Sequence, residues 1–109
     1  MITISFEDQP LHDSCVDLHR AEQMFGSVHA AAIVTFISDA MAFDNTSEFI
    51  DFLGRDVQIL PDDTLSVAIG SDYRAALVVA GKRFKRSQDG RISWTSVTRL
   101  KLVEISRLP

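Results

Sequence analysis

Apolar and polar residues first alternate with the period of a strand and then with the period of a helix. Residues 2–6, ITISF, alternate and are rich in β-formers, which predicts a strand. Pro10 suits the first turn of a helix that ends at Gly26. One stripe of that helix is apolar, at Leu11, Cys15, Leu18 and Phe25. The opening of the chain therefore predicts one strand followed by one long amphipathic helix.

A second long helix is predicted next, with Ser27 as its N-cap. Its apolar residues recur at i, i+3, i+4, i+7 and i+8, which indicates packing along its whole length: Ile33, Phe36, Ile37, Ala40 and Met41. Asn45 and Glu48 then resemble a capping box. They open a short helix through residues 47–53, which Gly54 ends.

Beyond residue 54 the pattern changes to short β-branched runs separated by turn signals. The runs are VQIL at 57–60, LSVAIG at 65–70, YRAALVVA at 73–80 and VTRLKLVEIS at 97–106. Tight turns are predicted at 61–63 and 70–72, and SQDGR at 87–91 closes a longer hairpin. This order predicts an α+β fold, with an N-terminal strand and two helices packed on a mostly antiparallel sheet of four to five strands.

Length and composition predict one domain, residues 1–109, without repeats or linkers. A hydrophobic content of 46% with 24% charged residues excludes a mainly disordered chain. No apolar run approaches the roughly 20 residues that span a bilayer, and the first ten residues lack the features of an export signal. Since the single Cys15 cannot form an internal disulfide, we expect a cytoplasmic protein with no membrane partner.

Charge is distributed very unevenly along the chain, which has a net charge of −4. Residues 1–72 hold thirteen acidic residues and two arginines, a net charge of −11. Residues 73–109 hold nine lysines and arginines and two acidic residues, a net charge of +7. Two interpretations follow: the basic part faces an anion while the acidic part keeps the protein soluble, or the two parts pair across the fold.

Motifs for metal or nucleophilic chemistry are weak. His12, Cys15 and His19 share one helical face at i, i+3 and i+7, a spacing open to a soft metal. Cys15 also belongs to the apolar stripe, and no fourth ligand can be located, so a core cysteine flanked by solvated histidines is favoured. His29 has no partner that the sequence identifies. No catalytic triad or phosphate-binding loop is found, and we expect neither a metal nor a cofactor.

Arg74 lies in an otherwise apolar strand pattern. Alternation places it on one face with Ala76 and Val78, while Tyr73 lies on the other face. Small neighbours leave room for the guanidinium to project into a groove, where its fixed fork can hold a phosphate. The alternative is an ion pair with one of the many acidic residues of the first part of the chain.

Residues 82–86, KRFKR, are a dense cluster of cations around one aromatic ring. Such a cluster suits a nucleic-acid backbone, and Phe84 can stack on an unpaired base. The alternative is a solvated loop whose charge serves solubility. The candidate RNA-binding residues are Lys82, Arg83, Phe84, Lys85 and Arg86.

Several stretches in matching order carry a resemblance to a known family. They are FG at 25–26, FDNTSEFIDFLG at 43–54, LSVAIGSDYRAALVV at 65–79 and DGRISWTSVTRLKLVEI at 89–105. Together they resemble the RelE/ParE superfamily of type II toxin–antitoxin toxins, in particular its HigB-like "plasmid maintenance killer" branch. The similarity covers residues 1–105.

The resemblance implies a small helix-on-sheet fold and a function as an mRNA interferase. Many members enter the ribosomal A site and cleave mRNA, and a cognate antitoxin, here expected to be a helix-turn-helix protein, neutralises them. Arg74 matches the strand arginine that the resemblance assigns to the scissile phosphate, and Arg107 can supply a C-terminal cation. These two are the candidate catalytic residues of an endoribonuclease whose partners are the ribosome and mRNA.

Two departures from the family pattern keep a second function open. The segment VQILPDD at 57–63 carries acidic residues where family members carry cations, and the chain ends EISRLP without a Tyr-His pair. The alternative is a catalytically degenerate module of the same fold, which pairs with an antitoxin or acts on a target other than RNA, as ParE-type relatives do.

Overall fold

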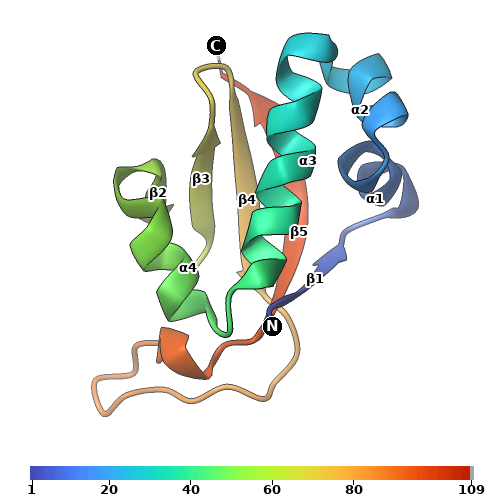
Figure 1. Cartoon of the computed structure of the whole chain (residues 1–109). Helices are drawn as coiled ribbons and strands as arrows, with labels where there is room; N and C mark the ends of the chain where they lie inside the picture. The colour runs from blue at the N-terminus through green and yellow to red at the C-terminus, as the bar shows by residue number, and fades with distance from the viewer. Residues whose placement is uncertain (109) are drawn as a thin grey trace.

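Strands in the second part of the chain bury every second side chain and form the centre of a five-stranded sheet. The computed structural model describes residues 1–108 and is α+β (Figure 1). The sheet has the order β1-β5-β4-β3-β2. β1 runs parallel to β5, and every other neighbouring pair is antiparallel, so the sheet is mixed. The strands are β1 (Thr3–Phe6), β2 (Val57–Ile59), β3 (Leu65–Ile69), β4 (Tyr73–Val79) and β5 (Arg99–Arg107).

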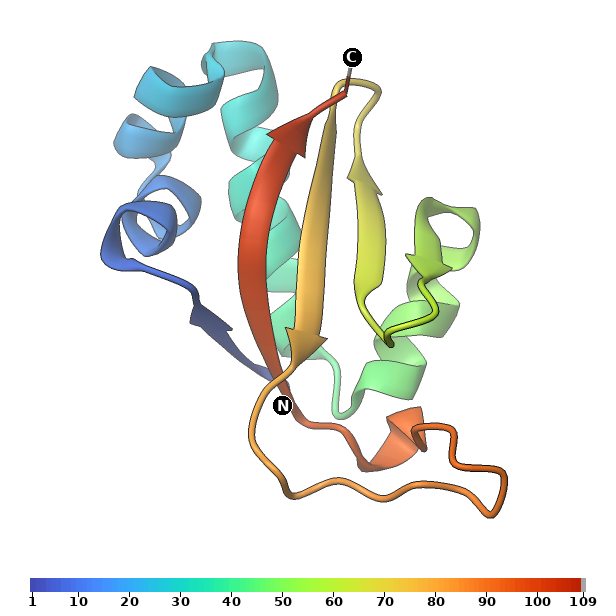
Figure 2. The ribbon, with the colours of Figure 1, turned by 180° about the vertical axis from the view of Figure 1, so that it is seen from behind.

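One long helix, α3 (Ser27–Ala42), lies across one face of this sheet, and the core forms between them (Figure 1). The stripe predicted for this helix is confirmed, because four of its five residues are buried: Ile33, Phe36, Ile37 and Ala40. Two short helices, α1 (Gln9–Val16) and α2 (Leu18–Phe25), pack beside it, and α4 (Thr46–Leu53) flanks the other edge. Seen from behind, the opposite face of the sheet carries no helix (Figure 2).

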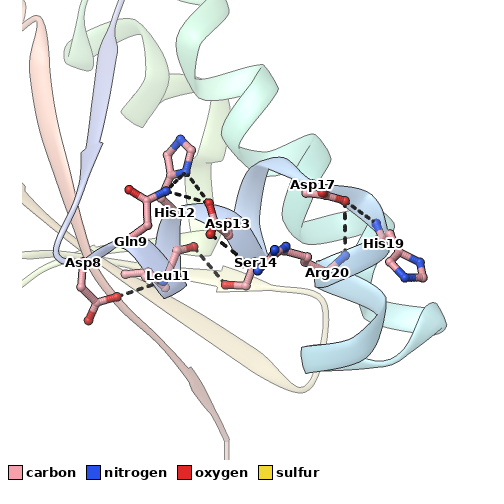
Figure 3. Close-up of polar contacts among 9 residues, drawn as sticks. All are labelled: Asp8, Gln9, Leu11, His12, Asp13, Ser14, Asp17, His19 and Arg20. Atoms are coloured by element: carbon pink, nitrogen blue, oxygen red, sulfur yellow. Dashed lines mark hydrogen bonds and ion pairs between the residues drawn. The ribbon is translucent and has the colours of Figure 1, made fainter.

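The single helix predicted between Pro10 and Gly26 is wrong, because the chain breaks at Asp17. Asp17 has the extended backbone angles φ −110° and ψ 113°. Its carboxylate accepts hydrogen bonds from the backbone N–H groups of His19 at 2.9 Å and Arg20 at 3.3 Å (Figure 3). This N-cap starts a new helix in a new direction. The predicted apolar stripe is thereby interrupted, and Leu18 is 49% exposed.

We expect Asp17→Ala to lower the free energy of unfolding by about 1 kcal/mol, because it removes the acceptor that caps α2. Urea denaturation of the two proteins measures this difference. Asp39→Ala is the matched control, since Asp39 is an exposed carboxylate of α3 and forms no hydrogen bond or ion pair within residues 1–108. Equal losses in the two variants would show that the cap contributes nothing to stability.

The remaining predicted helix ends are partly confirmed. Asn45 caps α4 by accepting from the backbone N–H of Glu48 at 3.0 Å, and Gly54 ends that helix at a φ of 56°. Ser27 is not the N-cap of α3 but its first residue. Gly26 is both the C-cap of α2 and the N-cap of α3, because no link separates the two helices. Its φ of 83° lies in the left-handed region that favours glycine.

The connection between β4 and β5 differs from the predicted hairpin. Its tip does form a tight turn, in which the backbone N–H of Ser87 donates to the carbonyl of Arg91 at 2.8 Å. Beyond that turn, however, only one isolated bridge forms, between Arg86 and Ile92. Residues 80–98 are therefore a long irregular loop, closed by a short 3-10 helix at Trp94–Ser96. Within residues 1–108, no helix combines the length and the apolar character that crossing a membrane requires.

Candidate nucleic-acid interface

The face of the sheet that no helix of the described chain covers is called here the open face (Figure 2). It carries Arg74 among small side chains. Residues paired directly across neighbouring strands point to the same face. Arg74 pairs with Ala68 on β3 and with Ser106 on β5. The predicted alternation along β4 is confirmed, because Tyr73 is buried on the other face while Arg74 and Ala76 are half-buried. The side chains on both sides of Arg74 are therefore small and leave its guanidinium accessible.

Arg74 is held by a serine and not by an acid. Its Nε donates to Ser66 Oγ at 2.8 Å, and its Nη2 donates to the carbonyl of Ser66 at 3.1 Å. Within residues 1–108 no carboxylate lies within 4.0 Å of the guanidinium, so the ion pair considered as an alternative is not formed. A guanidinium has five N–H donors, and two hydrogen bonds leave the others for an anion. Ser66 thus orients Arg74 without neutralising it.

The loop at residues 80–98 forms a second cationic feature, at the end of the sheet where β4 stops (Figure 1). A cavity of about 180 Å³ opens there, and Lys82, Arg83 and Arg99 contribute to its lining. All three are exposed, and none lies within 4.0 Å of a carboxylate of the described residues. A small cavity with three unpaired cations at its rim suits a phosphate group.

The five predicted RNA-binding residues fall into two groups. Lys82, Arg83 and Lys85 are exposed, and their charges are free within residues 1–108. Phe84 is partly buried and packs against the core, and the Arg86 guanidinium lies 5.5 Å from its ring centroid. Arg86 also donates to the carbonyl of Gly90 at 3.0 Å, so this residue stabilises the loop. A base that stacked on Phe84 from that side would have to displace Arg86.

The uneven charge of the sequence is largely retained in space. Only two cations of the second part pair with acids of the first part within residues 1–108: Arg86 lies 3.8 Å from Asp63, and Lys101 lies 2.9 Å from Glu7. The acidic residues of the first part lie on the helices, in the links and caps next to them, and in the turns on either side of β3. Five cations on the open face or its adjoining loop have no carboxylate within 4.0 Å in the described chain: Arg74, Lys82, Arg83, Lys85 and Arg99. Pairing across the fold therefore neutralises only part of the basic charge.

The candidate catalytic residues and the loop lie apart. Arg74 begins β4 and the loop follows its end, so about 17 Å of strand separates them at roughly 3.3 Å per residue. Arg107 pairs with Tyr73 across the strands, so its side chain leaves the sheet on the helix-covered face. Arg74 leaves on the open face. The structure brings Arg74 and Arg107 to the same end of the sheet but not to the same side.

His29 and Asp72 form a polar cluster at the end of the sheet where β4 starts, and the sequence did not predict it. His29 Nε2 lies 2.9 Å from Asp72 Oδ2, and the two rings of His29 and Tyr73 meet edge-on with centroids 5.1 Å apart. His29 comes from the first turn of α3 and Asp72 from the turn between β3 and β4. Their pairing depends on how α3 crosses the sheet, which no spacing along the chain encodes.

The possible soft-metal group is resolved in favour of a core cysteine. Cys15 is fully buried, and burial raises the pKa of its thiol to about 11. His12 instead lies 3.1 Å from Asp13, and this contact is the main cause that lowers the pKa of the Asp13 carboxyl (Figure 3). His19 lies 3.4 Å from Gln23. Residues 1–108 contain no group of three or more His, Cys, Asp or Glu side chains placed to hold a metal ion.

Comparison with protein families, with curated proteins and with solved structures found no match for this chain.

Proposed function

We propose that the chain binds RNA and inhibits translation by cleaving mRNA at the ribosome, as the toxin of a type II toxin–antitoxin system. The observation that supports this most is the set of five cations without carboxylate partners in the described chain, on the open face and its adjoining loop. A nucleic-acid backbone supplies the negative charge that such a surface lacks. The arrangement of strands and helices is also compatible with the helix-on-sheet fold that the family resemblance implies.

In this proposal the two basic regions do different work. Ser66 orients Arg74, which holds a phosphate of the bound RNA and offsets charge that develops during cleavage. Lys82, Arg83 and Lys85 contact RNA backbone, including that of the ribosome, at the other end of the sheet. An acidic helix of a cognate antitoxin, expected to be a helix-turn-helix protein, competes with RNA by covering Arg74.

One observation favours a second candidate, a binding module that pairs with an antitoxin or another target without cleaving RNA. The open face of the described chain carries no histidine near Arg74, and the one carboxylate next to it there, Glu104 opposite Ala76, is not within 4.0 Å of the guanidinium, so no acid–base pair contacts Arg74. Cleavage through the 2′-hydroxyl needs both a base and an acid. In this second candidate the cationic surface serves binding alone.

Induced expression in a bacterial host tests the proposal. We expect the wild-type protein to arrest growth and to produce new mRNA 5′ ends inside ribosome A sites. Arg74→Ala removes a phosphate contact and is expected to reduce the cuts about 10²-fold or more. Arg55→Ala, which removes an exposed arginine near α4, is the matched control and is expected to leave the cuts unchanged.

The outcomes separate the two candidates. Arrest with cuts that depend on Arg74 supports the endoribonuclease. Arrest without cuts supports the binding module. Normal growth with soluble, folded protein would contradict the endoribonuclease and favour a catalytically silent binding module.

A further inference from the structure

The geometry points to His29 as a general base for RNA cleavage, positioned by Asp72 and placed beside Arg107. This inference rests on the proposed RNA-cleaving function and supplies the proton acceptor that cleavage needs. It places the reacting bond at the end of the sheet where α3 begins, on the helix-covered side. RNA that reaches this place from the open face passes around the start of β4, at the turn that carries Asp72.

Asp72 holds one ring nitrogen of His29. The 2.9 Å contact joins Nε2 to Oδ2, which leaves Nδ1 as the nitrogen that can meet a substrate. The His29 side chain is 24% exposed and that of Asp72 is 45% exposed, so both are partly buried and still open to solvent. A carboxylate on one nitrogen fixes the tautomer and stabilises the imidazolium that forms when the other nitrogen takes a proton.

Aromatic packing fixes the plane of the His29 ring. Tyr73 is buried, and its ring meets the rings of both His29, at 5.1 Å, and Phe25, at 5.4 Å, edge-on. The Tyr73 ring and the Asp72 carboxylate together hold the imidazole of α3 against the start of β4. A base held in one orientation loses little freedom when the substrate arrives.

Arg107 lies on the same side of the sheet as this cluster. It is the direct neighbour of Tyr73 across β4 and β5, and its side chain is exposed. The backbone N–H of Leu108 donates to the carbonyl of Asp72 at 2.7 Å, which ties the end of β5 to the turn that carries Asp72. Within residues 1–108 no carboxylate lies within 4.0 Å of the Arg107 guanidinium. Among the described residues its charge is therefore left for a phosphate next to His29.

The chemical step balances with these groups and water. His29 Nδ1 takes the proton of the 2′-hydroxyl as the 2′-oxygen forms a bond to phosphorus, and the bond from phosphorus to the 5′-oxygen breaks. Water protonates the leaving 5′-oxygen, and the imidazolium returns its proton to solvent. Arg107 offsets the charge on the non-bridging oxygens. The products are a 2′,3′-cyclic phosphate and a 5′-hydroxyl end, and Arg74 holds a neighbouring phosphate on the open face.

A cleavage assay with the full chain on translating ribosomes tests this assignment. We expect His29→Ala to slow cleavage by about 10²–10⁴-fold, as loss of a general base does. Added imidazole should restore part of the rate to His29→Ala, because it can enter the space that the ring leaves. His29→Gln, which keeps a polar side chain of similar length, should be as slow but show no rescue. Asp72→Asn should also slow cleavage, by a smaller factor.

His12→Ala is the matched control. His12 also contacts an aspartate, Asp13, at 3.1 Å, but it lies on α1, away from Arg107. We expect this variant to cleave at the wild-type rate, and circular dichroism of each variant checks that it is folded. Wild-type cleavage by folded His29→Ala would overturn the role of His29 and leave the endoribonuclease intact. Cleavage products with 5′-phosphate ends would overturn it too, whereas a wild-type protein that makes no cuts would overturn both proposals.

Discussion

Phe49→Ala is expected to lower the free energy of unfolding by about 3–5 kcal/mol, because the change removes a fully buried ring. Phe49 is 0% exposed and belongs to the core cluster. Its ring lies 5.8 Å from the ring of Phe36 on α3 and 5.8 Å from that of Phe43 in the link before α4. Removing it leaves a cavity where three elements meet. The free energy of unfolding of a protein is only about 5–15 kcal/mol, so Phe49→Ala removes a large part of it.

Thermal unfolding followed by circular dichroism measures this change, at about 4–8 °C of Tm for each kcal/mol in a small domain. Phe52→Ala is the matched control. Phe52 belongs to the same helix and contacts the ring of Phe43, at 5.1 Å, but it is 61% exposed. We expect its removal to cost well under half as much. Equal Tm values for the two variants would show that α4 is not anchored through Phe49.

Local patterns were enough to predict the strands and the α+β class. Leu65, Val67 and Ile69 alternate with polar or small residues, and that period alone indicates which face of β3 is buried. The same reasoning failed at Asp17. Asp17 lies between two residues of the predicted apolar stripe, and an acidic residue at such a position is common on the solvent-exposed face of a helix. Its role as an N-cap became evident only from the hydrogen bonds that it accepts from His19 and Arg20. The parallel pairing of β1 with β5 depends on contacts between the two ends of the chain.

In the candidate site too, features set by local alternation could be predicted, whereas contacts between distant elements could not. The face of Arg74 followed from alternation along β4, but its serine partner did not, because Ser66 lies on another strand. The sequence grouped Arg74 with Arg107, whereas the register of β5 against β4 sends them to opposite sides of the sheet. His29 and Asp72 could not be paired from the sequence, since 43 positions separate them and only the path of α3 brings them together.

Neutralising the exposed cations of the loop is expected to weaken RNA binding by about 10²-fold. The variant combines Lys82→Ala, Arg83→Ala and Lys85→Ala, and each solvent-exposed ion pair with a phosphate contributes up to about 1 kcal/mol. None of these side chains has a carboxylate within 4.0 Å in the described chain, so no acid is left unpaired by the change. The structural cation Arg86 is kept, because it lies on Phe84 and binds the turn at Gly90. The loop should therefore keep its shape.

The dependence of affinity on salt distinguishes the removal of phosphate contacts from a general change in charge. Each contact with a single strand contributes about −0.7 to the slope of log affinity against log salt, so the triple variant should reduce the slope by roughly 2. Arg20→Ala with Arg55→Ala removes two cations from places outside the proposed interface, since Arg20 lies on α2, 3.7 Å from Asp13, and Arg55 directly follows α4. This control should keep both affinity and slope close to wild type. If both variants bound RNA equally weakly, net charge rather than a defined surface would govern RNA binding.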